Sequence, residues 1–135
     1  MDHHISSLLN EWSARPFVWG TTDCCQFARA AAWQIHGTVV DAPAYISERD
    51  ARRTLDRLGG YAGLLRSAGM HARPLAAARR GDFVIFEHKG PGLFLHGLAL
   101  VTGLQAHAPG RSSMEAIDRP LWLECWGPAD QKGGA

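Results

Sequence analysis

The chain has 135 residues, of which 46% are hydrophobic and 20% charged, and its formal net charge is +1 at pH 7. This balance is typical of one globular domain. It offers no electrostatic support for nucleic-acid binding, because no run of Lys or Arg is longer than a pair. The longest apolar run, residues 93–101, is too short to span a membrane. The first residues lack the basic and apolar regions of a signal peptide, so we expect a soluble product made in the cytoplasm.

The first half of the chain predicts four helices. The spacing of apolar residues places them at residues 5–14, 24–35, 48–58 and 61–68. Thr22 or Asp23 is a suitable N-cap for the second helix, and Ser47 is one for the third. Glycines follow the last three helices and are expected to end them.

The character of the sequence changes after Pro74, where short apolar stretches alternate with turn residues. These stretches predict five strands, at residues 83–87, 93–101, 104–107, 114–117 and 121–126. Helices followed by an antiparallel sheet make an α+β fold. We expect one domain over residues 1–126 and a loose polar tail over residues 127–135.

Cys24 stands where the second predicted helix begins. A cysteine attacks as its thiolate, and a helix N-terminus lowers the pKa of a thiol because unpaired N–H groups and the helix dipole favour negative charge. The same N–H groups suit the oxyanion of an acyl-transfer intermediate. Cys24 is therefore a candidate nucleophile. The alternative is an inert thiol, because Cys24 also lies on the apolar stripe of the helix.

Cys25 is the competing thiol. One residue along a helix is a rotation of about 100°, so we expect Cys25 to point away from the groove that Cys24 faces and to serve in packing. Adjacent cysteines rarely bridge and three is an odd number, so no disulfide framework is expected. A structural zinc site is disfavoured, because close paired ligand spacings are missing among Cys24, Cys25, His88, His96, His107 and Cys125.

Two histidines in the second half are candidates for a general base. His96 interrupts the apolar run at residues 93–101, where a titratable ring costs free energy unless it is hydrogen-bonded or used. A strand would hold it at a fixed position near the thiol. His107 follows eleven residues later on the next predicted strand. A hairpin would bring both rings together, so that His107 orients His96. The alternatives are a half-exposed strand histidine and an ordinary loop histidine.

Four stretches, in the same order, resemble the NlpC/P60 family of papain-like cysteine peptidases. Residues 17–27 (FVWGTTDCCQF) are similar to the family's aromatic-x-Trp-Gly and Asp-Cys-Ser-Gly motif, which puts Cys24 at the nucleophile. The other three stretches are similar to the strand that opens the sheet, the strand that bears the base and the strand that bears the third polar residue. They are residues 81–86 (GDFVIF), 96–103 (HGLALVTG) and 105–108 (QAHA).

The resemblance implies a papain-like fold and hydrolysis of an amide in the peptidoglycan stem peptide, with no metal or organic cofactor. It implies that Cys24 attacks, that His96 is the base, that His107 orients His96, and that the Cys24 N–H contributes to the oxyanion hole. The chain resembles in particular the compact members encoded by bacteriophages, prophages and gene transfer agents. This implies that tail hub or tip proteins are its partners and that the virion is its location. From the interspersed charges and the short apolar runs we expect it to bind no nucleic acid and no membrane.

The chain departs from the family pattern at three places. Phe17 replaces the usual Tyr, Cys25-Gln26 replaces Ser-Gly, and Gly97 follows His96 directly where the family has its Gly one residue later. These departures favour the alternative of a structural tail component with little activity on the same fold. A cellular amidase or acyltransferase is a third possibility.

Overall fold

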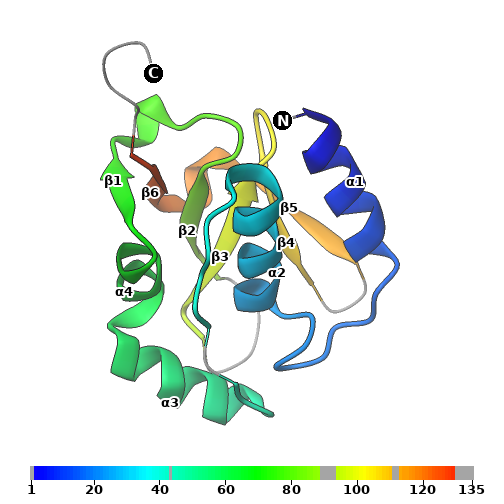
Figure 1. The fold of residues 1–135 in the computed structure, drawn as a ribbon, viewed down its shortest axis with the longest axis vertical. Coiled ribbons are helices and arrows are strands. Elements are labelled where there is room, and N and C mark those ends of the chain that lie inside the picture. Colours follow the sequence, from blue (N-terminus) through cyan, green and yellow to red (C-terminus); the bar gives the residue numbers. More distant parts are fainter. Residues whose placement is uncertain (1, 43, 89–93, 111–112, 130–135) are drawn as a thin grey trace.

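The computed structural model describes residues 2–42, 44–88, 94–110 and 113–129. These residues form an α+β fold in which four helices precede a sheet of six antiparallel strands, which confirms the predicted fold class (Figure 1). The helices are α1 (Asp2–Ser13), α2 (Cys24–Ala31), α3 (Glu48–Leu58) and α4 (Gly60–Ser67). Each helix begins close to its predicted start.

The sheet has the strand order β1-β6-β2-β3-β4-β5, and every neighbouring pair is antiparallel. Its strands are β1 (Met70–Arg73), β2 (Phe83–Glu87), β3 (His96–Val101), β4 (Ala106–Pro109), β5 (Met114–Ile117) and β6 (Trp122–Pro128). The last strand therefore lies inside the sheet, between β1 and β2.

The sequence did not predict β1. Its four residues, Met-His-Ala-Arg, are too few for a clear periodic signal and include none of the β-branched residues or of Phe, Tyr and Trp that are typical of strands, and they become a strand by pairing with β6. The partner strand also extends further than expected, because Gly127 and Pro128 pair with His71 and Met70. The predicted tail thus loses its first two residues to the sheet, and residues 130–135 lie outside the described part of the chain.

The second helix changes its winding after Ala31. Residues Ala32–His36 form a π-helix, which ends at Gly37 in the left-handed conformation with φ 65°. The N–H of Thr38 bonds the carbonyl of Ala32 at 3.1 Å. The predicted helix over residues 24–35 is therefore an α-helix for its first two turns and a π-helix at its end. π-helices are rare and often occur at functional sites.

The sheet has apolar side chains on both faces. On β3, Leu98 and Leu100 belong to the core that the helices cover, whereas Ala99 and Val101 belong to a second cluster on the opposite face. Figure 1 shows α2 in front of the middle of the sheet, and α2 packs on β3 and β4. α2 therefore lies against the strands that carry His96 and His107.

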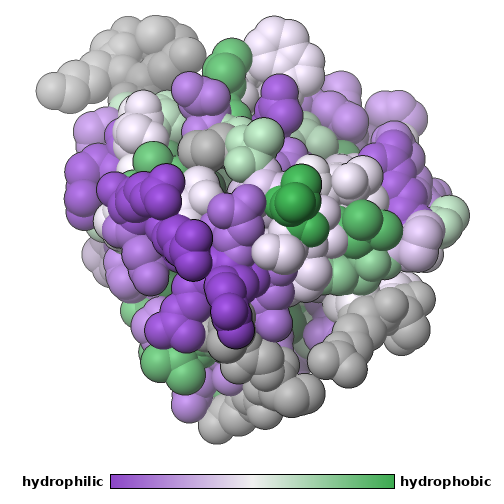
Figure 2. Space-filling view, turned by 90° about the horizontal axis from the view of Figure 1, so that it is seen from below, coloured by the Kyte–Doolittle hydropathy of each residue, from purple (hydrophilic) through white to green (hydrophobic). Residues whose placement is uncertain are grey.

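α3 is the outermost helix of the described chain. Ser47 caps it, as predicted, and it buries Ala51 and Leu55, while most of its other residues are charged. It packs mainly on α4. Figure 2, seen from below, shows strongly hydrophilic side chains gathered on the side where α3 runs. An apolar stripe under a charged surface is typical of a helix that lies over a core without entering it.

Candidate active site

The start of α2 is organised around the buried carboxylate of Asp23, which is the N-cap. This carboxylate accepts hydrogen bonds from two N–H groups in the first turn of α2 and, at 2.6 Å, from the N–H of Gly20. The hydroxyl of Tyr45 donates a fourth at 2.5 Å. A buried carboxylate with this many donors fixes the local backbone. Cys24 is thereby held as the first residue of the helix, as the sequence predicts.

Gly20 allows the loop before α2 to pass close to the segment that carries Tyr45. Its φ is +84°, and a Cβ at this position would lie only 2.0 Å from the carbonyl oxygen of Tyr45. A residue with a side chain would force the two segments apart. The Trp-Gly pair of the motif therefore has a structural reason, which is to let Asp23 reach both segments.

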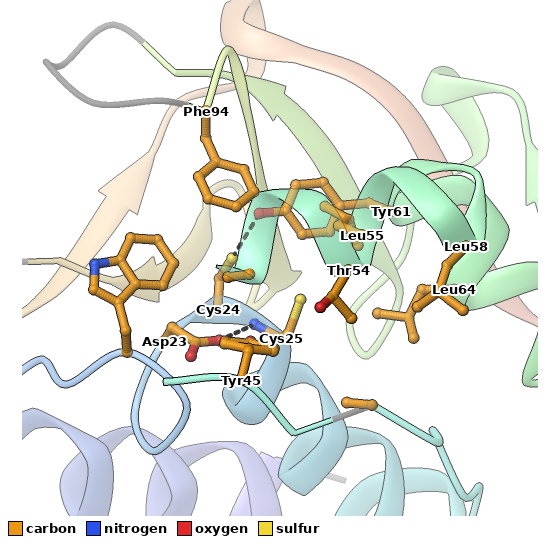
Figure 3. Close-up of a pocket in the computed structure, with 13 residues that line it drawn as sticks. Asp23, Cys24, Cys25, Tyr45, Thr54, Leu55, Leu58, Tyr61, Leu64 and Phe94 are labelled. Atoms are coloured by element: carbon orange, nitrogen blue, oxygen red, sulfur yellow. Dashed lines mark hydrogen bonds between the residues drawn. The ribbon is translucent and has the colours of Figure 1, made fainter. Parts of the chain in front are cut away.

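Cys24 is half-buried, and its Sγ lies 3.2 Å from the hydroxyl of Tyr61 (Figure 3). Tyr61 comes from α4 and is 37 residues away in the sequence, so no local pattern points to this contact. Among the described residues, no hydrogen bond takes the N–H of Cys24. That N–H and the Tyr61 hydroxyl are two donors beside the thiol, as the stabilisation of an oxyanion requires.

Cys25 is buried and borders the same cavity as Cys24 (Figure 3). The expectation that the two thiols face different surroundings is therefore wrong, although Cys25 does pack in the core. The physical reason is that Cα–Cβ bonds tilt toward the N-terminus of a helix. In the first turn, where no earlier turn separates them, both side chains extend past the end of α2 into one space.

The neighbours of Cys24 lower the pKa of its thiol. The largest effect is a hydrogen bond with the Cys25 side chain, and it opposes the burial of Cys24, which raises the pKa. The Tyr61 hydroxyl and the backbone of Leu98 lower the pKa further, while the charge of Asp23 raises it. The pKa of Cys25 is raised, first by the same hydrogen bond and then by burial. These surroundings favour the thiolate at Cys24 over the thiolate at Cys25.

The cavity beside the two thiols has a volume of about 10 Å³, which is room for one water molecule. Side chains of α3 and α4 line part of it, and aromatic rings line another part. The ring of Phe94 stacks on Trp19 with centroids 5.4 Å apart and lies 6.2 Å from the ring of Tyr61. A peptide does not fit in this space, so access to Cys24 requires these side chains to move.

His96 is the first residue of β3 and is exposed. It lines a neighbouring pocket of about 270 Å³, whereas the lining of the Cys24 cavity does not include it. The two spaces share Leu55, Tyr61 and Phe94. These three side chains form the wall between the thiol and the imidazole.

Leu98 shows how the position of His96 on β3 relates to the position of Cys24. Leu98 follows His96 by two residues on the same face of β3, about 7 Å along an extended strand, and its backbone is near enough to the Cys24 thiol to lower the pKa of that thiol. Within the described part of the chain, no hydrogen bond joins His96 to Cys24. The imidazole thus stands on the correct face of the sheet but outside the closed cavity.

His107 lies on β4 directly opposite Leu100 of β3. Leu100 is four residues from His96, which is about 13 Å along the strand. The Nδ1 of His107 lies 2.7 Å from Oγ1 of Thr102, on the side of Leu100 away from His96. The expectation that the hairpin brings the two imidazoles together is therefore wrong. The turn at residues 102–105 sets this register, and burial lowers the pKa of His107.

Asp82, from the Gly-Asp stretch, is buried and has a structural environment. Its carboxylate lies 3.3 Å from Nε of Arg73, accepts the N–H of Arg79 at 3.1 Å and lies 3.5 Å from the thiol of Cys125. These contacts join β1 and β6 to the start of β2. β2 begins at the next residue, as the motif predicts.

The described residues contain no group of three His, Cys, Asp or Glu side chains placed to hold a metal ion. In the same part of the chain, no helix has the length and apolar character needed to cross a bilayer.

A family model described as "Domain of unknown function (DUF6950)" matches residues 1–127 of the chain. The match takes in the start of α2, the cavity beside Cys24 and nearly all of the sheet. No curated protein matches the sequence.

Proposed function

The chain belongs to the family described as Domain of unknown function (DUF6950), and from the site of this member we propose a cysteine peptidase or amidase that hydrolyses an amide in peptidoglycan stem peptides. The observation that carries the proposal is the thiol of Cys24 at the start of α2, beside a free N–H and the Tyr61 hydroxyl. A thiol with a lowered pKa next to two donors is the arrangement that acyl transfer needs.

The substrate class rests on the resemblance to the NlpC/P60 family. The first similar stretch ends at the beginning of α2, the second leads into β2, and the third and fourth lie on β3 and β4. Cys24 begins α2, and α2 packs against β3, the strand that carries His96. This arrangement agrees with the resemblance. The amide bond next to a D-amino acid is the expected point of cleavage.

The mechanism needs three residues of this chain. The Cys24 thiolate adds to the carbonyl carbon of the substrate, and the Cys24 N–H and the Tyr61 hydroxyl stabilise the oxyanion. His96 takes the thiol proton and gives it to the leaving amine as the C–N bond breaks. A water molecule, deprotonated by His96, then hydrolyses the thioester and regenerates the thiol. His107 has no part in this sequence, because its ring is turned toward Thr102.

The reaction requires the wall between thiol and imidazole to open. The side chains of Tyr61 and Phe94 line both spaces and separate them. We propose that a bound substrate displaces the Phe94 ring and lets the His96 ring turn toward Cys24. The closed arrangement would then be the resting form, in which a peptide has no room to reach the thiol.

A structural tail component with little activity is the second candidate. The small volume of the cavity and the position of His96 outside it favour this candidate. Such a protein would keep Cys24 as a packed thiol whose partners are Cys25 and Tyr61.

Digestion of purified peptidoglycan tests the choice between the two candidates. We expect the protein to release peptide fragments with new free amino groups. Mass spectrometry of the soluble products identifies these fragments, and their masses show which bond was cleaved. Heat-inactivated protein is the control. Two results together would support the structural component instead. The peptidoglycan would stay intact after prolonged incubation, and Cys24 would be labelled no faster than free cysteine.

We further propose that the protein acts in the tail tip of a phage-like particle, held there by contacts with tail hub proteins. This proposal rests on the resemblance to compact family members carried in tails. Cys24→Ala protein is expected to enter particles as efficiently as the wild type, because the nucleophile should contribute little to folding or docking. Mass spectrometry of purified tails measures both proteins. Intact tails that lack the wild-type chain would contradict the assignment.

A further inference from the structure

A third hollow runs along α2 and shares no lining residue with the Cys24 cavity. Its volume is about 520 Å³, within the range of sites for small ligands. Four of its residues, at the spacing i, i+3, i+4, i+7, form one stripe of the helix. We call this hollow the α2 groove, and it is lined by Trp12, Thr21, Gln26, Arg29, Ala30, Trp33, Thr38, Val39 and Val40.

Trp33 lies in the α2 groove with 62% of its surface exposed, and Val39 beside it is 69% exposed. Leaving an indole in water forgoes the stabilisation that its large apolar surface would give on burial. Trp33 is part of the π-helix Ala32–His36, a winding that is often found at functional sites. The indole is therefore placed as an open platform in a concave site.

The polar groups of the α2 groove are few and varied. Gln26, Thr21 and Thr38 offer amide and hydroxyl groups, which both donate and accept hydrogen bonds. Arg29 is the only charged residue in the lining, and among the described residues it has no ion-pair partner. The groove is therefore positively charged, and its guanidinium suits a carboxylate.

We propose that the α2 groove binds an acylated amino sugar that carries a carboxylate. The C–H groups on one face of a sugar ring pack against the indole of Trp33. The hydroxyl and amide groups of the sugar match Gln26, Thr21 and Thr38, and the carboxylate pairs with Arg29. The choice of the acidic amino sugar of the cell wall rests on the proposed function, whereas the class of ligand follows from the groove itself.

The test is a titration of Cys24→Ala protein with N-acetylmuramic acid and with neutral N-acetylglucosamine, followed by calorimetry and by NMR. We expect the acidic sugar to bind about 10-fold more tightly than the neutral one. Arg29→Gln should abolish this preference, because a charge-assisted hydrogen bond is lost. Trp33→Ala should weaken both sugars by about 10-fold or more, and Trp33→Phe should weaken them less.

Two exposed residues outside the groove provide matched controls. Leu104→Ala removes an 89% exposed apolar side chain, and Arg53→Ala removes an exposed cation of α3, so neither should change sugar binding. Binding of neither sugar, or binding that Trp33→Ala leaves unchanged, overturns the proposal. A change in self-association or in tail incorporation of Trp33→Ala, without sugar binding, would make the groove a protein-docking surface instead.

The outcome is separable from that of the proposed function. Sugar binding is measured with protein that lacks the nucleophile, and hydrolysis is measured with the wild type. Peptidoglycan cleavage without sugar binding overturns the α2 groove alone. Sugar binding without cleavage overturns the proposed peptidase alone.

Discussion

Cys24→Ala is expected to lower peptidoglycan hydrolysis by about 10³-fold or more, because it removes the only group that forms the covalent intermediate. Cys25→Ser should keep most of the activity, since its hydroxyl still donates a hydrogen bond to the Cys24 thiolate and the side chain keeps its size. Release of peptides from purified peptidoglycan, measured for each variant at equal concentration, gives the comparison. Thermal unfolding of each variant checks that the fold is retained.

Histidine variants extend the same assay. His96→Ala should lower the rate by about 10²-fold or more, whereas His107→Asn is the matched control and should be near wild type, because the register places its ring beside Thr102. An active Cys24→Ala together with an inactive Cys25→Ser would reverse the choice of nucleophile. A large loss in His107→Asn, with none in His96→Ala, would reject the assignment of the base.

Iodoacetamide labels a cysteine faster as the pH rises. For Cys24 we expect this rise at a lower pH than for a free thiol. The reason is that the Cys25 and Tyr61 side chains lower the pKa of Cys24 and so favour the reactive thiolate. Tyr61→Phe and Cys25→Ala each remove a donor, so each should raise this pKa and move the profile to higher pH. Below the pKa, every unit of upward shift lowers the labelling rate about 10-fold.

Cys125 is the internal control in the labelling experiment. It is buried, and burial and the neighbouring Asp82 raise its pKa to about 12. Peptide mapping at neutral pH should therefore find label on Cys24 and none on Cys125 in the folded protein. The cavity would not activate the thiol if the labelling rate of Cys24 followed pH as it does for free cysteine. The same conclusion would follow if neither Tyr61→Phe nor Cys25→Ala changed this pH dependence.

Much of the fold could be predicted because its signals are local. The N-cap at Asp23 and the glycines after the helices act within a few residues, so the position of Cys24 at a helix start follows from its immediate neighbours. Apolar stretches between turn residues likewise placed β2 to β6. The fold class and the place of the candidate nucleophile were therefore accessible from the sequence.

The features that the sequence did not predict depend on contacts between distant segments. Tyr61 meets Cys24 across 37 residues, and β1 becomes a strand only because β6 lies beside it. The pairing of His107 with Leu100 depends on where the turn between the strands closes, and a shift in register changes every pair along the hairpin. The shared cavity of Cys24 and Cys25 depends on how α3 and α4 cover the end of α2.

The position of β6 between β1 and β2 has a consequence for synthesis on the ribosome. A nascent chain that ends before Trp122 holds β1 and β2 without the strand that joins them. α4, which packs on β1 and carries Tyr61, is then not fixed over Cys24. We therefore expect the cavity beside Cys24 to form only after β6 has left the exit tunnel and paired with β1 and β2.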